Sequence, residues 1–115
     1  METKDITFII VTFHSDNVIF ECLNSLPNDS KKIVIENSQN LNLKNIVEKK
    51  YNNLRCILSN ENLGYGRANN IGIRLCETDY VFILNPDVRF KFSDLEKFLE
   101  VLNKENFVIA APVAF

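Results

Sequence analysis

The stretch YVFILNPDVR, residues 80–89, decides the predicted fold. Five apolar residues run from Tyr80 to Leu84 without a break, and turn-forming residues follow at once. A short apolar run bounded by turn residues predicts a strand buried on both faces, of the kind found in the centre of a parallel sheet. Because Pro86 has no N–H to donate to a neighbouring strand, we expect the strand to end before it.

Asp87 follows directly after this strand, at its carboxyl end. In open α/β sheets, ligands bind outside the carboxyl ends of the strands. A carboxylate at that position suits a divalent cation, which prefers oxygen ligands. Asn85, Pro86 and Asp87 are also the residue types of ordinary turns, so this stretch alone leaves a plain turn as the alternative.

The composition is that of an ordinary soluble domain. The chain has 115 residues, of which 46% are hydrophobic and 24% are charged, and its formal net charge is −2. This length predicts one domain with one core. The slightly negative charge provides no basic surface for nucleic acid or for an anionic membrane, so we expect no nucleic-acid partner.

The three cysteines, Cys22, Cys56 and Cys76, are expected to be reduced and buried, because their number is odd and no Cys-x-x-Cys pair occurs. No apolar run reaches the length of a membrane span. The N-terminus lacks the pattern of a signal peptide. These features predict a cytoplasmic protein.

Segments typical of strands and helices alternate along the chain. The expected strands are residues 6–13, 32–36, 54–58, 80–84 and 107–111. Buried strands that alternate with helices form a parallel sheet covered on both faces, and right-handed crossovers make that sheet doubly wound. The predicted fold class is therefore α/β, a doubly wound, mostly parallel sheet with helices on both faces, in a single domain over residues 1–115.

The strands that end at residues 13, 36 and 85 are expected to be neighbours. Since the carboxyl ends of parallel strands meet at one edge of the sheet, one rim should gather Thr12, His14, Glu36, Asn37 and Asp87. An acidic side chain at the end of the second strand, here Glu36, commonly accepts hydrogen bonds from a nucleoside, and a solvated strand end is the alternative. His14 is the single histidine, and it is either a ligand contact or a plain loop residue.

Gly64 and Gly66 precede an expected helix, whose N-terminal amides favour an anion such as phosphate. The alternative is an entry turn, because Gly-x-Gly alone is not a phosphate-binding motif. Arg67 and Arg74 are candidates to meet a diphosphate, although solvated helix residues are the more ordinary interpretation. Gly72 is expected to allow close packing of the helix on the sheet.

Four segments together resemble family 2 glycosyltransferases, and most of all their bacterial rhamnosyltransferase-like branch. They are residues 11–15 (VTFHS), 35–38 (IENS), 62–72 (NLGYGRANNIG) and 82–87 (FILNPD). The resemblance covers nearly the whole chain. It implies the GT-A fold, with a Rossmann-like nucleotide-binding half, a nucleoside-diphosphate sugar of the UDP or dTDP type as donor, and Mg²⁺ or Mn²⁺ as cofactor.

The resemblance also implies roles for single residues. The implied nucleotide-sugar-binding residues are Thr12, His14, Glu36, Asn37, Gly64, Asn69 and Asn85. Glu36 matches an acidic residue that contacts the nucleoside and that is more often Asp in the family. Asn85 and Asp87 match the Asp-x-Asp metal motif, so Asp87 is implied as the metal ligand and Asn85 as a weaker, neutral contact.

One departure from the family concerns the catalytic base. Family members supply it, usually as an Asp, from a second half that binds the acceptor, and no residue after Asp87 is expected to serve here. Asp94 is explained by its place in the first turn of a helix. The chain is therefore expected to be the donor-binding domain of the family, truncated relative to it, with no catalytic residue of its own.

The expected reaction is inverting, metal-assisted transfer of a sugar to a cell-envelope polysaccharide or glycolipid, by a protein peripheral to the inner membrane face. An alternative is a catalytically inactive module that binds a nucleotide sugar or a partner protein. Another is an unrelated doubly wound nucleotide-binding domain, since a fold does not fix a function. The apolar residues 108–115 are expected to leave an exposed edge or patch, which predicts a homodimer.

Overall fold

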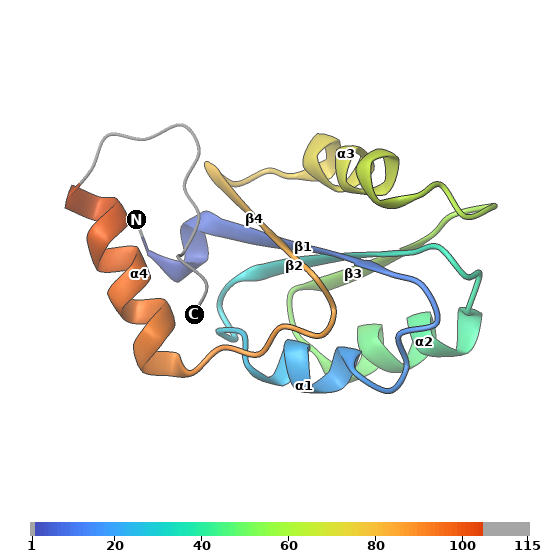
Figure 1. Cartoon of the computed structure of the whole chain (residues 1–115), viewed down its shortest axis with the longest axis horizontal. Helices are drawn as coiled ribbons and strands as arrows, with labels where there is room; N and C mark the ends of the chain where they lie inside the picture. Colours follow the sequence, from blue (N-terminus) through green and yellow to red (C-terminus); the bar gives the residue numbers. More distant parts are fainter. Residues whose placement is uncertain (1, 105–115) are drawn as a thin grey trace.

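The computed structural model describes residues 2–104, in which four parallel strands form one sheet in the order β3-β2-β1-β4. Helices lie on both faces of this sheet (Figure 1). In chain order the elements are a 3-10 turn (Thr3–Asp5), β1 (Ile6–Thr12), α1 (Ile19–Asn24), β2 (Lys31–Glu36), α2 (Leu41–Lys50), β3 (Leu54–Leu58), α3 (Tyr65–Leu75), β4 (Tyr80–Leu84) and α4 (Phe92–Lys104). The predicted fifth strand, residues 107–111, lies outside the described residues.

Strand β1 is one of the two interior strands of the sheet, and all seven of its residues are buried. It pairs in parallel with β2, in a register that ends with Thr12 opposite Glu36. On its other side it pairs in parallel with β4, in a register that ends with Ile10 opposite Leu84. The predicted neighbourhood of these three strand ends is therefore confirmed.

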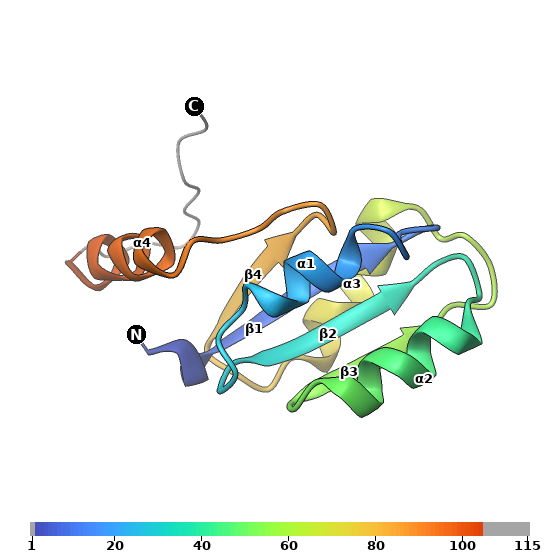
Figure 2. The same ribbon diagram turned by 90° about the horizontal axis from the view of Figure 1, so that it is seen from below.

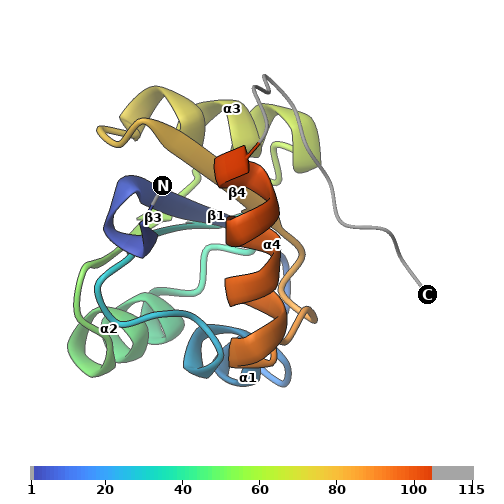
Figure 3. The ribbon, with the colours of Figure 1, turned by 90° about the vertical axis from the view of Figure 1, so that its left-hand side faces the viewer.

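The helices are divided between the two faces of the sheet. Helices α1 and α2 cover one face, and α3 lies on the opposite face (Figures 1 and 2). Helix α4 lies at the end of the sheet where β1 begins (Figure 3). This arrangement confirms the predicted α/β class with a parallel sheet and helices on both faces.

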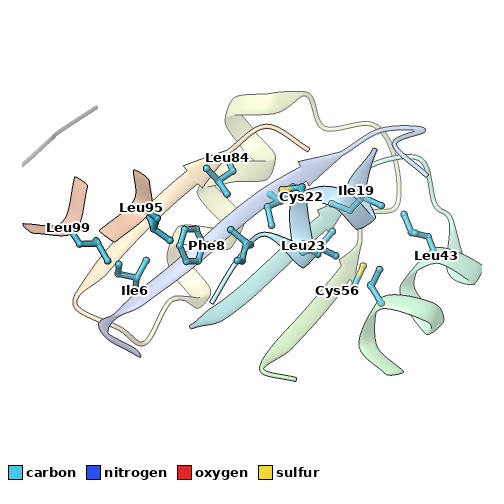
Figure 4. Packing of buried hydrophobic residues seen from close by; sticks show 14 of the residues in the cluster. Ile6, Phe8, Ile19, Cys22, Leu23, Leu43, Cys56, Leu84, Leu95 and Leu99 are labelled. Carbon is cyan, nitrogen blue, oxygen red and sulfur yellow. The ribbon is translucent and has the colours of Figure 1, made fainter. Parts of the chain in front are cut away.

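The core is unequal on the two sides. The larger cluster packs residues of β1, such as Phe8, against apolar side chains of the face that carries α1 and α2, and Leu95 and Leu99 of α4 extend it (Figure 4). The smaller cluster lies under α3 and joins Ala68 to residues of β1 and β2 such as Val11. Apolar clusters therefore pack against both faces of the sheet.

The prediction that residues 80–84 form a strand buried on both faces at the sheet centre is wrong for the described residues. Strand β4 lies at the edge of the sheet. Only Leu84 is buried in it, while Val81 and Ile83 are 38% and 43% exposed. The physical reason is that α3 packs over β1 and β2, so that no helix among residues 2–104 covers this side of β4.

The cysteines and the helices bear on two further expectations. Cys22 and Cys56 are buried free thiols, as expected, whereas Cys76 is only half-buried. Within residues 2–104, no helix combines the length and the apolar character needed to cross a membrane.

Candidate functional site

The carboxyl ends of β1, β2 and β3 and the start of α3 meet at one rim, where hydrogen bonds connect them. The centre of this network is Glu36, the last residue of β2, which is fully buried. Thr12, the last residue of β1, donates from Oγ1 to Glu36 Oε1 over 3.2 Å. Two of the residues predicted to share a rim are therefore in direct contact.

The loop after β2 wraps around the same carboxylate. The backbone N–H groups of Ser38 and Asn40 donate to Glu36 Oε2 over 2.9 and 2.8 Å. The Ser38 hydroxyl donates to Glu36 Oε1 over 2.5 Å. A buried charge needs such partners, since an ionised carboxylate without them is costly to bury. Glu36 therefore fixes the loop that follows its own strand.

His14 is tied to this loop through its backbone. Its N–H donates to the Ser38 hydroxyl oxygen over 3.1 Å. Its φ of 50° lies in the left-handed region, which non-glycine residues adopt only when the surroundings hold them there. The imidazole is exposed and contacts the ring of Phe13 edge-on, with 4.4 Å between ring centroids.

Asn37 connects β2 to β3 and to the start of α3. Its side-chain oxygen accepts from the Ser59 hydroxyl over 2.5 Å, just after β3. Its side-chain amide donates to the carbonyl of Gly64 over 3.4 Å. Gly64 has a φ of 77°, which favours glycine, and it immediately precedes α3. Four of the five predicted rim residues, Thr12, His14, Glu36 and Asn37, thus belong to one connected network, which also reaches Gly64. The fifth, Asp87, is not part of it in the described residues.

Helix α3 presents its N-terminus at this rim. The first N–H groups of a helix have no partner within the helix, so they attract anions. Asn69 lies one turn further along α3, buried at 5% exposure, and within the described residues its side-chain oxygen has no hydrogen-bond partner. An unpartnered buried amide oxygen is unusual in a folded protein. Arg67 and Arg74 are exposed on the same helix.

Asn85 and Asp87 are exposed and lie in a hydrogen-bonded turn, in which Val88 N–H donates to the Asn85 carbonyl over 3.1 Å. The turn packs on α1: the Cys22 thiol approaches the Asn85 carbonyl at 3.9 Å. Burial raises the pKa of Cys22 to about 11, and the negative charge of Asp87 adds to this effect. Among residues 2–104, no hydrogen bond joins Asp87 to the network around Glu36.

A divalent metal fits this position only in part. Asp87 offers one exposed carboxylate, and Asn85 offers an amide oxygen. The described residues contain no group of three His, Cys, Asp or Glu side chains that could hold a metal ion by themselves. Mg²⁺ commonly takes one or two carboxylates and completes its shell with water and substrate phosphates. The donor set is therefore compatible with a metal that binds together with a diphosphate.

Sequence reasoning missed several residues of this rim. Phe13 is 51% exposed at the end of β1, although the pattern placed it in a buried strand. Ser38, Asn40 and Ser59 supply contacts that connect the loops after the strands. Their signal in the sequence was only that small polar residues follow each strand, and this is also typical of ordinary loops.

Two surface hollows lie away from this rim. One, of about 450 Å³, is lined by residues at the starts of β2 and β3, including Lys31 and Leu54. The other, of about 430 Å³, lies between α4 and the loop before β2, and Phe92 and Asn28 belong to its lining. Neither contains a predicted site residue.

Comparisons with known proteins agree with this fold. The structure of S. aureus TarS 1–349 has a TM-score of 0.73 and 22% identity, over 86% of this chain and 32% of that chain. The same protein in complex with UDP has a TM-score of 0.71 and 21% identity, over 86% of this chain and 32% of that chain. A longer TarS structure has a TM-score of 0.70 and 21% identity, over 86% of this chain and 19% of that chain.

The chain thus spans about a third, or less, of the solved structures it resembles, and at this identity the likeness establishes the fold, which is of the GT-A type. No curated protein matches the chain. The family model described as glycosyl transferase family 2 matches residues 7–115, nearly the whole sequence. The chain therefore belongs to glycosyl transferase family 2.

Proposed function

We propose that this chain is the donor-binding domain of a glycosyltransferase that uses a nucleoside-diphosphate sugar. The observation that carries the proposal is the convergence of the ends of β1, β2 and β3 with the N-terminus of α3 at one polar rim. Membership of family 2 supports it. The TarS structure that holds UDP has the same fold, which supports a UDP-type donor, with dTDP as the other candidate.

In this proposal, different residues of the site bind different parts of the donor. The nucleotide-sugar site comprises Thr12, His14, Glu36, Asn37, Gly64, Asn69 and Asn85. The exposed aromatic ring of Phe13 offers a stacking surface for a base. The N-terminus of α3 faces the diphosphate, because its free N–H groups favour negative charge. Asp87 would hold Mg²⁺ or Mn²⁺, and the metal would supply positive charge against the diphosphate leaving group.

The proposed reaction is inverting transfer to a cell-envelope polysaccharide or glycolipid, at the inner face of the membrane, by a homodimeric cytoplasmic protein. This reaction needs a base within hydrogen-bond reach of the acceptor hydroxyl. Among the described residues, Glu36 and Asp16 already accept hydrogen bonds, the latter from the Asn40 side chain over 2.9 Å. These two carboxylates are therefore engaged within the chain. A module that binds the nucleotide sugar without transferring the sugar is the second candidate function.

Calorimetric titration of UDP and dTDP, with and without Mn²⁺, tests the proposal. We expect binding that Mn²⁺ strengthens at least tenfold, and we expect Asp87→Asn to remove that gain. The matched control is Asp79→Asn, since Asp79 is an exposed aspartate just before the other end of β4. If neither nucleotide binds at millimolar concentration, the proposal is wrong. A second measurement, of UDP released from a UDP-sugar in the presence of an acceptor, then distinguishes sugar transfer from binding alone.

A further inference from the structure

We infer that Glu36 is a positioning residue. It holds the loops of the rim in place and makes no direct contact with the nucleoside. The inference rests on the proposed donor site and assigns one of its residues a different role. It departs from the simplest expectation, in which the acidic residue at the end of the second strand accepts hydrogen bonds from the nucleoside itself.

The first argument is the number of hydrogen bonds that the carboxylate already accepts. An ionised carboxylate has about four acceptor sites, two on each oxygen. Oε1 accepts from the hydroxyls of Thr12 and Ser38. Oε2 accepts from the backbone N–H groups of Ser38 and Asn40. All four donors belong to the chain itself, and Glu36 is 0% exposed. A nucleoside hydroxyl or N–H group would have to displace one of them.

The second argument is what these hydrogen bonds hold in place. The Ser38 hydroxyl, which donates to Glu36, accepts the N–H of His14 and so supports its left-handed backbone. Asn40, held by the same carboxylate, caps α2 by accepting the N–H of Leu43 over 3.0 Å. Glu36 therefore connects the loop after β1, the loop after β2 and the start of α2.

Two exposed side chains next to this network are available to a ligand. Phe13 and His14 are exposed next to each other at the end of β1. Their orientation depends on the His14 backbone, which Ser38 and, through it, Glu36 hold. The carboxylate thus acts on the nucleotide through these residues.

The third argument is side-chain length. Replacing Glu36 with Asp withdraws the carboxylate by about 1.5 Å, the length of one carbon–carbon bond. An Asp at this position cannot keep all four donors within hydrogen-bond distance, because the bonds to Asn40 and Ser38 are already at 2.8 and 2.9 Å and the bond to Thr12 is at 3.2 Å. A positioning role therefore predicts that Glu36→Asp disrupts this hydrogen-bond network and weakens UDP binding.

The test measures the affinities of UDP, 2′,3′-dideoxy-UDP and 3-methyl-UDP for wild type, Glu36→Gln and Glu36→Asp. If Glu36 acts by positioning, both variants bind all three ligands more weakly, and the ratios between ligands stay within about twofold of the wild-type ratios. A direct contact would instead change one affinity ratio in Glu36→Gln by about tenfold or more. A contact with the ribose would lower the ratio of UDP to 2′,3′-dideoxy-UDP affinity, and a contact with the base would lower the ratio of UDP to 3-methyl-UDP affinity. Unchanged or tighter UDP binding by Glu36→Asp would also overturn the inference.

A second readout needs no nucleotide. The amide NMR signals of Ser38, Asn40 and His14 should shift, and those amides should exchange with solvent faster, in Glu36→Gln. The matched control is Glu48→Gln, because Glu48 also accepts a backbone N–H, that of Cys56 over 3.0 Å, away from the rim. This control should leave nucleotide affinity unchanged.

The two readouts separate the possible failures. If wild type binds none of the nucleotides, the proposed function fails, and the role of Glu36 in a donor site fails with it, whatever the amide signals show. If wild type binds UDP but the three amides are unaffected in Glu36→Gln, the positioning role alone is wrong.

Discussion

Gly72 of α3 lies directly against Ile9 of β1, so closely that a Cβ atom on Gly72 would stand 2.6 Å from Ile9 Cγ2. No real side chain tolerates that distance, and Ile9 is a fully buried residue of β1, an interior strand. The sequence prediction that Gly72 allows close helix packing is thereby confirmed. The contact sets how near α3 lies to the sheet.

Gly72→Ala is therefore expected to lower the free energy of unfolding by about 1–3 kcal/mol, because overpacking outweighs the helix propensity of Ala. Gly66→Ala is the matched control, since its added Cβ meets no atom within 4 Å. We expect that change to be neutral or to stabilise by up to about 1 kcal/mol. Urea unfolding measures both, and equal stability of the two variants would contradict the packing argument.

Asn69→Leu should separate stability from binding. The side-chain oxygen of Asn69 is buried without a partner in the described structure, so its removal is expected to leave stability unchanged or raise it by about 1 kcal/mol. Because Asn69 belongs to the proposed nucleotide-sugar site, nucleotide affinity should fall at least tenfold in the same variant. Asn70→Leu is the control, because Asn70 is exposed on the same turn of the helix. Calorimetry measures the nucleotide affinity of both variants, and thermal unfolding measures their stability. Equal affinities of the two variants would contradict a role of Asn69 in binding.

The two buried thiols should make the protein sensitive to alkali. Burial is the main cause that raises the pKa of Cys22 to about 11 and that of Cys56 to about 12, from an ordinary value of 9.0. Above pH 9 the unfolded chain loses these protons while the folded chain keeps them. Stability is therefore intact below pH 9 and declines as the pH rises towards 11 and 12, by about 1–2 kcal/mol per thiol at pH 10.5.

Denaturant titrations at pH 8.0 and pH 10.5 measure this loss. The double variant Cys22→Ala/Cys56→Ala should start from a lower stability, because it creates cavities. Its stability should nevertheless fall less between the two pH values than that of wild type. An identical fall in both proteins would show that other groups cause the alkaline sensitivity.

Cys76 should be the first thiol to react with an alkylating reagent. Burial alone would raise its pKa, but hydrogen bonds with Thr7 and Thr78 and the charge of Lys31 outweigh burial and lower the pKa. The thiolate is the reactive form, and Cys76 is only half-buried.

Mass spectrometry after brief treatment with iodoacetamide at pH 7.5 should find Cys76 modified at least tenfold faster than Cys22 or Cys56 in the native protein. Thr78→Val removes a hydroxyl that lies 3.2 Å from the Cys76 sulfur, so it should slow the reaction. Thr3→Val is the control, because Thr3 bonds to Asp29 elsewhere. Equal rates for the three thiols would contradict the prediction.

Residues 108–115, on which the homodimer prediction rested, lie outside the described residues. Among the described residues, the exposed side of β4 is the surface on which we expect the proposed homodimer to form. Val81 and Ile83 are exposed on an edge strand, and an apolar edge invites pairing with another strand. Ile83→Lys should move the protein from dimer to monomer in sedimentation velocity runs at high concentration. Ile46→Lys is the matched control on α2, where Ile46 is 41% exposed. A wild-type protein that stays monomeric at millimolar concentration would contradict the dimer.

Local patterns identified the elements because each reflects a short-range physical rule. The turn at Pro86 ends β4 where the missing N–H predicts it, and apolar periodicity located α3 and β1. The place of β4 in the sheet was not available from its composition. A run such as Tyr80–Leu84 suits a central strand, but whether a helix covers it depends on residues far away in the chain.

The sequence by itself determined the alternation of strands and helices, the resemblance to family 2, and which polar residues follow the strand ends. Only the tertiary structure decided that Glu36 is saturated by Thr12, Ser38 and Asn40, and that His14 is held in a left-handed conformation. The physical reason is that strand and helix formation depend on neighbouring residues, whereas hydrogen bonding of a buried carboxylate depends on which donors the folded chain brings within 3 Å or so.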